Sequence, residues 1–338
     1  MTDGSRTGAI VLAAYEPDAE LLRRQLLSLQ QQSVTAWMCI ISVDGPLEPV
    51  AEAVAAIVGD DGRFRVIGDG SRRGFYLNFE YGLQAVPADA AWVALCDQDD
   101  RWDADKLEKL LPHLADVSLV SAQARLVSYP SEEVTGQTDR VDRGWKHTLL
   151  SNQFTGSICV FDRDLLEIAL PFPRARTRVA THDHWLAVVA GAQRGTRIVD
   201  DVVQDYVQHD ANVFGDPSRM GPGGVVSSVR NIRDLARRSE GSSSPAAIAR
   251  MTFWTYVGWR QLLTDTLSGR VTDEHAERRQ ELFGSGRRWP AIRALLDAAV
   301  RDGDVPARFA TEYRASWRAG SLVGGRRLVQ RATPARRP

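Results

Sequence analysis

The chain has 338 residues, 43% of them hydrophobic, and a formal net charge of −1 at pH 7. It is long enough for one large or two medium domains with a substantial core. Because the net charge is near zero, the protein has no overall positive field that would attract nucleic acid. Cys39, Cys96 and Cys159 lie far apart in apolar runs, without metal-binding spacing. They are predicted to be reduced core residues of a cytoplasmic protein.

Neither end of the sequence predicts a membrane span. No uncharged apolar run approaches the ~18 residues that a spanning helix needs, and the N-terminal stretch lacks the layout of a secretory signal. From Arg318 on, the chain carries arginines and no acid. This C-terminal region is interpreted either as a solvated end or as a peripheral contact with anionic lipid at the inner face of the membrane.

Strand and helix patterns alternate in the first half. Buried-strand runs are expected at 9–14, 38–43, 64–67 and 91–96, and helices through Leu22–Leu29, Val50–Ile57 and Phe75–Ala85. Strands that alternate with helices of this length imply a parallel sheet with right-handed crossovers.

Polar residues follow directly after these strands. They are Tyr15 and Glu16, Asp44, the pair Arg72-Arg73, and Asp97 to Asp100. In an open parallel sheet ligands bind beyond the carboxyl ends of the strands, so four distant loops are expected to converge on one edge. Each of these residues alone would indicate no function. Tyr15, Glu16, Asp44 and also Asn78 are candidate site residues only because they are expected at that shared edge.

The later part of the chain is less regular. Strands are expected at 118–122, 156–161, 196–199 and 202–207, a polar loop at 130–143, and helices at 181–192, 246–267, 275–283, 289–300 and 305–317. Gly- and Ser-rich linkers at 215–224 and 239–245 suggest a boundary. The domains predicted are an α/β domain over 1–214 and a helical C-terminal region over 225–338.

The stretch CDQDDRW (96–102) places three carboxylates at the end of an apolar strand. In extended backbone Asp97 and Asp99 point to one face. Mg²⁺ and Mn²⁺ are typically held by one or two carboxylates and the phosphates of a substrate. The alternative is an acidic loop that caps the next helix, but Asp103 and Asp105 are already available for that. Metal–phosphate binding is therefore the favoured interpretation.

Other motifs are weaker. GDGSRRG (68–74) departs by one residue from the dinucleotide fingerprint and is interpreted as a solvated turn or as a loop that contacts a nucleotide through its arginines. His182 and His184 are badly spaced for zinc on a helix. Asp183 is either a helix cap or a general base, and His209 alone suggests a structural role. A Walker A loop and a GxSxG elbow are absent.

Together these residues resemble the family 2 glycosyltransferases, which have the GT-A fold, and among them the bacterial rhamnosyltransferase-type members. Seven stretches carry the resemblance, in the family's order over about 200 residues. They are VLAAYEPDAELLRRQLLSLQQQ, SVDGP, GFYLNFEYGL, CDQDDRWDADKL, NQFTGS, HDHWLAVVAG and YVQHDANVFG.

The resemblance implies a role for each matching position. Ala14, Tyr15 and Glu16 would flank the nucleotide base, and Asp44 would hydrogen-bond it. Asp97 would contact the nucleoside, and Asp99 would bind the divalent metal, Mn²⁺ or Mg²⁺. Asp183 would be the catalytic base, and His209 would lie near the diphosphate or metal. The predicted set also contains Arg73 and Asn78 as donor-nucleotide contacts and Asp100 as a further metal contact, whose alternative is a helix cap.

Some positions depart from the family. Val43 replaces one of the paired acids before Gly45, an arginine replaces an asparagine before Gly74, and the QxxRW signature of processive members is absent. The expected activity is inverting transfer of one sugar from a nucleotide-diphosphate donor (dTDP-rhamnose or a UDP-sugar) to a glycan, lipid-linked or small-molecule acceptor. The alternatives are a nucleotidyltransferase, disfavoured because AAYEPD has neither glycine nor lysine, and a catalytically inactive binding module.

Overall fold

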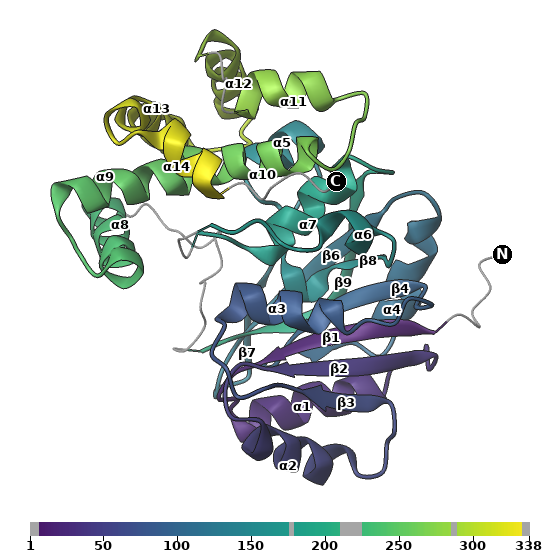
Figure 1. Ribbon diagram of the computed structural model, residues 1–338. Helices are drawn as coiled ribbons and strands as arrows, with labels where there is room; N and C mark the ends of the chain where they lie inside the picture. Colours follow the sequence, from purple (N-terminus) through teal and green to yellow (C-terminus); the bar gives the residue numbers. More distant parts are fainter. Residues whose placement is uncertain (1–6, 176–178, 210–224, 285–288, 333–338) are drawn as a thin grey trace. The chain divides into compact units, whose positions relative to one another are not determined.

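The computed structural model in Figure 1 describes residues 7–175, 179–209, 225–284 and 289–332. Its contacts divide the chain into two compact units. Unit 1 comprises Met1–Gly144, Gln153–Phe172 and His182–Arg219, and unit 2 comprises Trp145–Asn152, Pro173–Thr181 and Met220–Pro338. The boundary expected between 214 and 225 lies mostly in residues 210–224, outside the described residues.

Unit 1 is built on one mixed sheet with the strand order β3-β2-β1-β4-β8-β6-β9-β5, and β7 pairs with β6. The strands are β1 (Gly8–Ala14), β2 (Trp37–Val43), β3 (Phe64–Ile67), β4 (Trp92–Asp97), β5 (Arg101–Trp102), β6 (Leu119–Ser128), β7 (Glu133–Gln137), β8 (Val160–Asp162) and β9 (Thr196–Gln208). Strands β1 to β4 are parallel to one another, and β6 is parallel to β9, whereas β5, β7 and β8 pair antiparallel with their neighbours.

Helices cover both faces of the parallel part because successive side chains of β1 point to opposite faces. Ile10 and Leu12 share a core cluster with leucines of α1 (Ala19–Gln30) and valines of α2 (Leu47–Val58). On the other face lies α3 (Phe75–Gln84). A Cβ added at Gly82 of α3 would lie 2.6 Å from Val11 Cγ1, so glycine lets this helix approach the sheet closely.

The remaining elements of unit 1 are short and local. They are α4 (Lys106–Leu110), the 3₁₀ turns η1 (Leu111–Ala115) and η2 (Gly156–Ile158), α6 (Leu165–Ala169) and α7 (His182–Gly191). The indole of Trp185 in α7 donates to the Ala169 carbonyl of α6 at 2.8 Å. This bond fixes α7, which carries Asp183 in its first turn.

The structure differs from the sequence expectations mainly after residue 118. The expected polar loop contains β7, and the run 156–161 begins with the turn η2 before β8. The two strands expected at 196–199 and 202–207 form the single strand β9. Its pairing with β6 shifts register between Ser121 and Gln123. That irregularity breaks the apolar pattern at the exposed pair Asp200-Asp201, without ending the strand.

Unit 2 is helical. Its described helices are α5 (Trp145–Leu150), α8 (Val225–Glu240), α9 (Pro245–Phe253), α10 (Trp259–Ser268), α11 (Ala276–Phe283), α12 (Trp289–Arg301), α13 (Ala307–Leu322) and α14 (Gly325–Ala332). The helix expected over 246–267 is divided by a π-helical turn at Trp254–Gly258. The buried Arg260 guanidinium donates to the Leu150 carbonyl at 2.8 Å and so ties α10 to α5. Within the described ranges no helix combines the length and apolarity that a bilayer crossing requires.

Candidate functional site

The ends of three neighbouring strands meet at one edge of the sheet in unit 1. Ala14 pairs with Val43, and Ala13 pairs with Asp97, so the first residues beyond β1, β2 and β4 lie side by side. The Ala14 carbonyl accepts a hydrogen bond from the Asp44 N–H at 2.8 Å. Ala14 itself is buried, so it shapes this edge through its backbone.

Gln98 joins the ends of β1 and β4. Its Oε1 accepts from the Tyr15 N–H at 2.8 Å, and its Nε2 donates to the Tyr15 carbonyl at 3.0 Å. The neighbouring Glu16 is exposed and has a φ of 40°, which is unusual for a residue with a side chain. The sequence pattern assigns no role to Gln98, although Gln98 lies between the acids of CDQDDRW.

Asp44 anchors the loop 68–74. Its two carboxylate oxygens accept from the backbone N–H groups of Arg73 and Gly74, the latter at 3.0 Å. Nε of Arg72 lies 3.5 Å from the same carboxylate, and the Arg72 guanidinium lies 3.6 Å from the centroid of the Tyr15 ring. Asp44 is only 3% exposed, so its bonds organise a surface formed by Tyr15 and Arg72.

Two predicted donor contacts have other partners. The Arg73 guanidinium lies 4.0 Å from the centroid of the Tyr81 ring and pairs with Asp69, so Arg72 is the arginine beside Tyr15. Asn78 accepts from the Ser42 hydroxyl and donates to the Ser42 carbonyl, both at 2.7 Å. Because Asn78 is 1% exposed, it packs α3 on β2 and offers no surface to a nucleotide. The prediction that Asn78 contacts the donor nucleotide is therefore corrected: Asn78 is a packing residue.

Four carboxylates gather around the end of β4. Burial raises the pKa of Asp97 well above its usual range, and the charges of Asp100, Asp99 and Asp183 raise it further. Asp183, in the first turn of α7, is thus close enough to act electrostatically on Asp97, 86 positions earlier in the sequence. Lys106 is the cation that opposes these charges on Asp97. Carboxylates this close raise one another's pKa, and a bound cation would relieve the repulsion between them.

Asp99 faces His209. Asp99 Oδ2 lies 2.8 Å from His209 Nε2, and both side chains are partly exposed. This hydrogen bond raises the pKa of His209 above its ordinary value, since the carboxylate favours the imidazolium. The two residues are predicted metal contacts, and the structure brings them together.

Asp100 is buried instead, with 1% exposure. Its Oδ2 accepts from Gln204 Nε2 at 2.8 Å, and its Oδ1 accepts from the Val207 N–H at 3.1 Å. Burial, together with the charge of Asp99, raises the pKa of Asp100 to about 7. These contacts give Asp100 a structural role, which corrects both its assignment to the metal and the alternative of a helix cap.

A metal site at Asp99 and His209 would be completed by its ligand. Among the residues placed by the structure, no group of three or more His, Cys, Asp or Glu side chains is arranged to hold a metal ion. A carboxylate, an imidazole and the oxygens of a diphosphate nevertheless form a donor set that suits Mn²⁺, and the imidazole nitrogen suits Mg²⁺ less well. The residues fit a cation that binds together with a phosphate-bearing substrate.

The first turn of α7 presents Asp183 beside a buried histidine. Asp183 is partly exposed, and its Oδ1 accepts from the His184 N–H at 2.6 Å. The His182 ring stacks on Phe79 of α3 with a centroid distance of 3.9 Å. Burial lowers the pKa of His182 to about 4, so the ring is neutral at pH 7. His182 therefore packs α7 on α3 and is no zinc ligand paired with His184.

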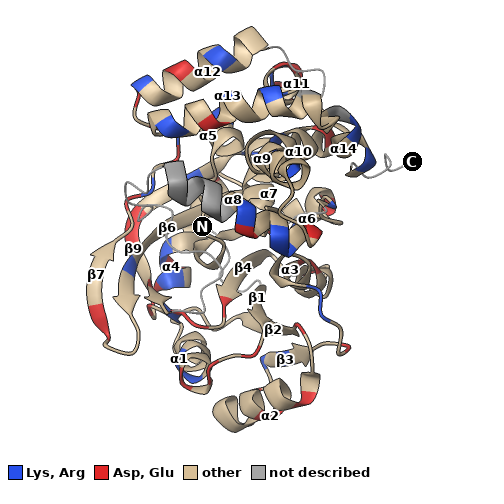
Figure 2. Ribbon diagram, turned by 90° about the vertical axis from the view of Figure 1, so that its left-hand side faces the viewer, with Lys and Arg blue, Asp and Glu red and all other residues tan. Residues whose placement is uncertain are grey.

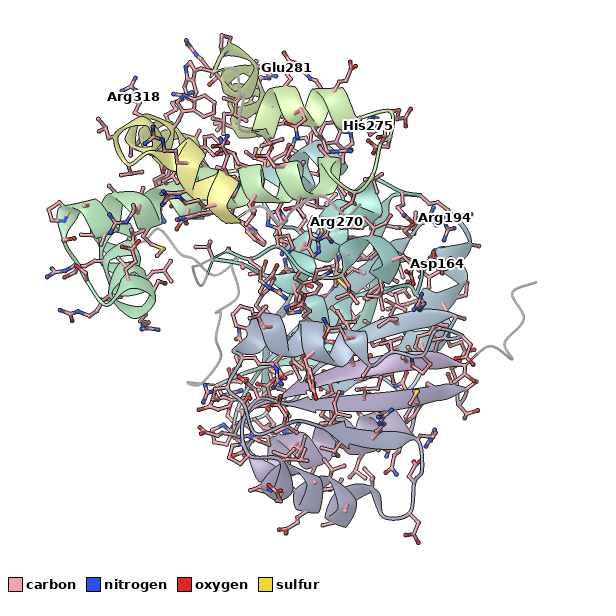
Figure 3. All side chains as sticks on the ribbon, in the orientation of Figure 1. Asp164, Arg194, Arg270, His275, Glu281 and Arg318 are labelled. Carbon is pink, nitrogen blue, oxygen red and sulfur yellow. The ribbon has the colours of Figure 1, made fainter. Side chains whose placement is uncertain are left out.

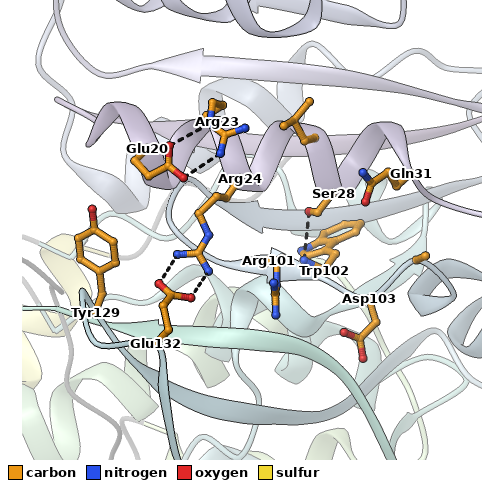
Figure 4. A pocket seen from close by; sticks show the side chains of 12 residues that line it. Glu20, Arg23, Arg24, Ser28, Gln31, Arg101, Trp102, Asp103, Tyr129 and Glu132 are labelled. Atoms are coloured by element: carbon orange, nitrogen blue, oxygen red, sulfur yellow. Dashed lines mark hydrogen bonds and ion pairs between the residues drawn. The ribbon is translucent and has the colours of Figure 1, made fainter.

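A separate cavity of about 710 Å³ lies along α1 and β5 (Figure 4). Its wall contains the Arg24–Glu132 pair, whose two hydrogen bonds measure 2.6 and 2.7 Å, and the Arg23–Glu20 pair. None of the predicted site residues lines it. Since its most prominent charges are already paired, it shows no preference for a charged ligand.

Comparison with known proteins supports a transferase domain. Residues 9–164 match the family model described as Glycosyl transferase family 2. The succinoglycan biosynthesis protein ExoW of Rhizobium meliloti (strain 1021) is 31% identical over 104 residues, which is 29% of this chain and 31% of that protein. The chain therefore matches less than a third of the length of this curated relative.

One solved structure shares the fold, and a second is similar over most of its length. Residues 1–349 of S. aureus TarS, in complex with UDP-GlcNAc, superpose with a TM-score of 0.51 at 12% identity, over 94% of this chain and 92% of that one. The mannosyltransferase PcManGT from Pyrobaculum calidifontis, with GDP-Man and Mn²⁺, gives a TM-score of 0.45 at 18% identity, over 98% and 87% of the two chains. The TarS likeness and the family match confirm the predicted GT-A fold with a helical C-terminal region.

Proposed function

We propose that this chain, which contains a family 2 glycosyltransferase domain over residues 9–164, transfers one sugar from a nucleotide-diphosphate donor to an acceptor hydroxyl with inversion. The single observation that carries the proposal is the convergence of the end of β4, with Asp97 and Asp99, on His209, whose Nε2 lies 2.8 Å from Asp99 Oδ2. The charge of Asp183 also acts on Asp97. A transferase of this kind needs a donor-binding carboxylate, a metal-binding carboxylate and a base at one site. The domains proposed remain a GT-A domain over 1–214 and a helical region over 225–338.

Asp183 is the proposed general base. It accepts the proton of the acceptor hydroxyl while that oxygen forms a bond to the anomeric carbon, and the bond to the donor diphosphate breaks on the opposite face. The charge that develops on the sugar ring is oxocarbenium-like, as in glycoside hydrolysis. Asp183 lies in the first turn of α7, and its side chain is partly exposed, so an acceptor can reach it.

The proposed donor lies across the edge of β1, β2 and β4. The Tyr15 ring and the Arg72 guanidinium contact the base, Glu16 flanks it, and Asp97 binds the nucleoside. Asp99 and His209 hold Mn²⁺ or Mg²⁺, which when bound neutralises charge on the leaving diphosphate. In this proposal Asp44 acts on the nucleotide mainly through the loop that it anchors.

A rhamnosyl donor, dTDP-rhamnose, rests on the sequence resemblance alone, and a UDP-sugar is the other proposed donor. The proposed acceptor is a glycan, a lipid-linked glycan or a small molecule. ExoW, which shares 31% identity over 104 residues, is a succinoglycan biosynthesis protein, and this supports a glycan acceptor. The absence of QxxRW in the sequence supports transfer of a single sugar.

A cytoplasmic location with peripheral contact to the inner face of the membrane is also proposed. Arg318 of α13 (labelled in Figure 3) and Arg327 and Arg331 of α14 are exposed, and Leu322 nearby is 89% exposed. Figure 2 shows the basic stretches of α14 in blue. No acid follows Glu312 in the sequence. Co-sedimentation with phosphatidylglycerol vesicles but not with phosphatidylcholine vesicles at low salt supports this contact, and equal pelleting with both contradicts it.

The test of the transferase is release of nucleoside diphosphate from a panel of dTDP-, UDP- and GDP-sugars. Release that depends on Mn²⁺ or Mg²⁺ and on an added acceptor supports the proposal. The rival function is a catalytically inactive module that binds sugar nucleotides. Such a module would show a metal-dependent rise in thermal midpoint with a donor, yet no release with any acceptor.

A further inference from the structure

A buried chain of hydrogen bonds runs from α4 toward the Asp99–His209 pair. The Lys106 ammonium donates to Gln204 Oε1 at 2.6 Å and to the Ser157 carbonyl at 2.7 Å. Gln204 Nε2 donates in turn to Asp100 Oδ2 at 2.8 Å and to the Ser157 hydroxyl at 3.0 Å. Lys106 and Gln204 have no exposed surface, so solvent does not compete for these bonds.

The chemistry of Lys106 determines which group donates and which accepts in this series of hydrogen bonds. An ammonium group donates hydrogen bonds and accepts none, so the oxygen of the Gln204 amide must face Lys106. The amide NH₂ must then face Asp100, which as a carboxylate accepts. If Lys106 were apolar, the Gln204 oxygen would lose its donor, and only the bonds to Asp100 and Ser157 would hold the amide in this orientation. Lys106 thus reinforces the orientation in which the NH₂ end of Gln204 reaches Asp100.

Asp100 connects this network to the end of β9, directly before His209. Its second oxygen accepts from the Val207 N–H at 3.1 Å. The bond continues the antiparallel pairing of β5 with β9, in which Trp102 faces Gln204 and Arg101 faces Asp205. The Asp99–His209 contact of 2.8 Å is the next link along the same two segments. The spacing of Asp99 and His209 therefore depends on how firmly Asp100 is held.

We propose that Lys106 and Gln204 are positioning residues for the Asp99–His209 pair: they fix Asp100, which aligns the loop after β4 with the end of β9. This inference rests on the proposed function, since it concerns the proposed cation site. Groups that orient metal ligands from outside the coordination sphere typically contribute 10- to 100-fold to metal affinity. Neither residue touches the donor or the reacting atoms in this proposal.

An exchange of donor and acceptor tests the arrangement. In Asp100→Asn an amide NH₂ faces the Gln204 NH₂, so two donors meet. In Gln204→Glu a carboxylate faces the Asp100 carboxylate, so two acceptors meet. Together they restore a complementary pair with its direction reversed, so that residue 100 donates and residue 204 accepts, and residue 204 still accepts from Lys106. The double variant also keeps the same net charge as the native protein.

The measurement is Mn²⁺ affinity, followed by the electron paramagnetic resonance signal of the free ion, beside the thermal midpoint without metal. Each single variant is expected to bind Mn²⁺ about 10-fold more weakly or worse, and the double variant to return to within about 3-fold of the native affinity. Two results overturn the proposal. One is single variants that lose thermal stability but keep native Mn²⁺ affinity. The other is a double variant as weak as the single ones, which would make Asp100 itself a ligand.

A second variant covers the case in which the exchanged proteins do not fold. Lys106→Met keeps the unbranched stem of the side chain, one atom shorter, and removes the donor, and is expected to weaken Mn²⁺ binding by about 10-fold. Lys109→Met is the matched control, because Lys109 lies on the same helix and pairs with Asp105 near the surface. Equal affinities in these two variants overturn the proposal. Because the site is completed by phosphate oxygens, Mn²⁺ affinity is measured with UDP or dTDP present and without a sugar donor. A native protein that binds Mn²⁺ in this way but releases no nucleoside diphosphate from any sugar donor contradicts the proposed function separately.

Discussion

His209 Nε2 lies 2.8 Å from Asp99 Oδ2, although the two residues are 110 positions apart in the sequence. A carboxylate and an imidazole at this distance can hold each other or share a cation. Mn²⁺ with a nucleoside diphosphate is therefore expected to raise the thermal midpoint of the native protein, because a ligand that binds only the folded state stabilises it. We expect EDTA to abolish the rise.

The same pair predicts which variants lose this effect. Asp99→Asn and His209→Ala should each remove most of the Mn²⁺-dependent rise measured by differential scanning fluorimetry. His113→Ala is the control, since His113 lies in η1 and contacts Arg197 instead of the acid cluster. A full rise in Asp99→Asn would place the cation elsewhere.

Asp183→Asn is expected to lower kcat by 10²- to 10⁴-fold, the usual contribution of a general base. Donor binding, measured calorimetrically with Mn²⁺ present, should remain within about 3-fold of native, because the amide keeps the size of the carboxylate. Asp164→Asn, an exposed change before α6, serves as the control. Loss of donor affinity in Asp183→Asn would show that this residue binds the donor instead.

Arg72→Met tests the surface over Tyr15. The guanidinium lies 3.6 Å from the ring centroid, and such contacts contribute about 0.5–2 kcal/mol. The variant should raise KM for the donor by roughly 3- to 30-fold and leave kcat nearly unchanged. Arg65→Met, on the exposed side of β3, should change neither. A lower kcat with an unchanged KM would show that Arg72 does not contribute to donor binding.

Gly82→Ala should destabilise unit 1, because the added Cβ would lie 2.6 Å from Val11 and 3.1 Å from Ser42 Cβ. Overpacking of this kind costs about 1–3 kcal/mol, measurable as a lower urea midpoint. Gly62→Ala is matched to it, since its Cβ would meet no atom within 4 Å. Equal midpoints for the two variants would mean that α3 can move away from the sheet at little cost.

His182 predicts a stability that falls with acid. The unfolded chain binds a proton near pH 6.5, whereas burial lowers the pKa of the folded group to about 4. Between these values unfolding takes up a proton, so stability declines as pH falls. From pH 7 to pH 5 the native protein should lose about 2 kcal/mol more than His182→Leu, by urea denaturation at both pH values. Parallel losses would mean that His182 is protonated in the fold.

The first four strands could be predicted closely because each is a local apolar run between helix signals. The shared edge followed from topology, since Tyr15, Asp44 and Asp97 must lie together once β1, β2 and β4 are parallel neighbours. Asn78 was wrongly placed there. It lies four residues before Gly82 on α3, so both face the sheet, and this spacing was already visible in the sequence.

The contacts of the acid cluster could not be predicted in the same way. β5 has two residues, Arg101 and Trp102, and exists only because β9 pairs with it about 100 positions later. A strand this short has no periodicity. Lys106 looked like an ordinary helical lysine, and nothing local indicated that it would be fully buried against Gln204. Such roles depend on pairings that the sequence pattern does not record.

The interleaving of the two units affects the order in which the protein can mature on the ribosome. α5 belongs to unit 2, but it is synthesised 110 residues before Arg260, which donates to its Leu150 carbonyl. At 5–20 residues per second this interval is on the order of 5–20 s. During that time β8, α7 and β9 of unit 1 emerge while α5 has no helical partner. The nascent chain must therefore complete its sheet around a segment whose own packing is delayed.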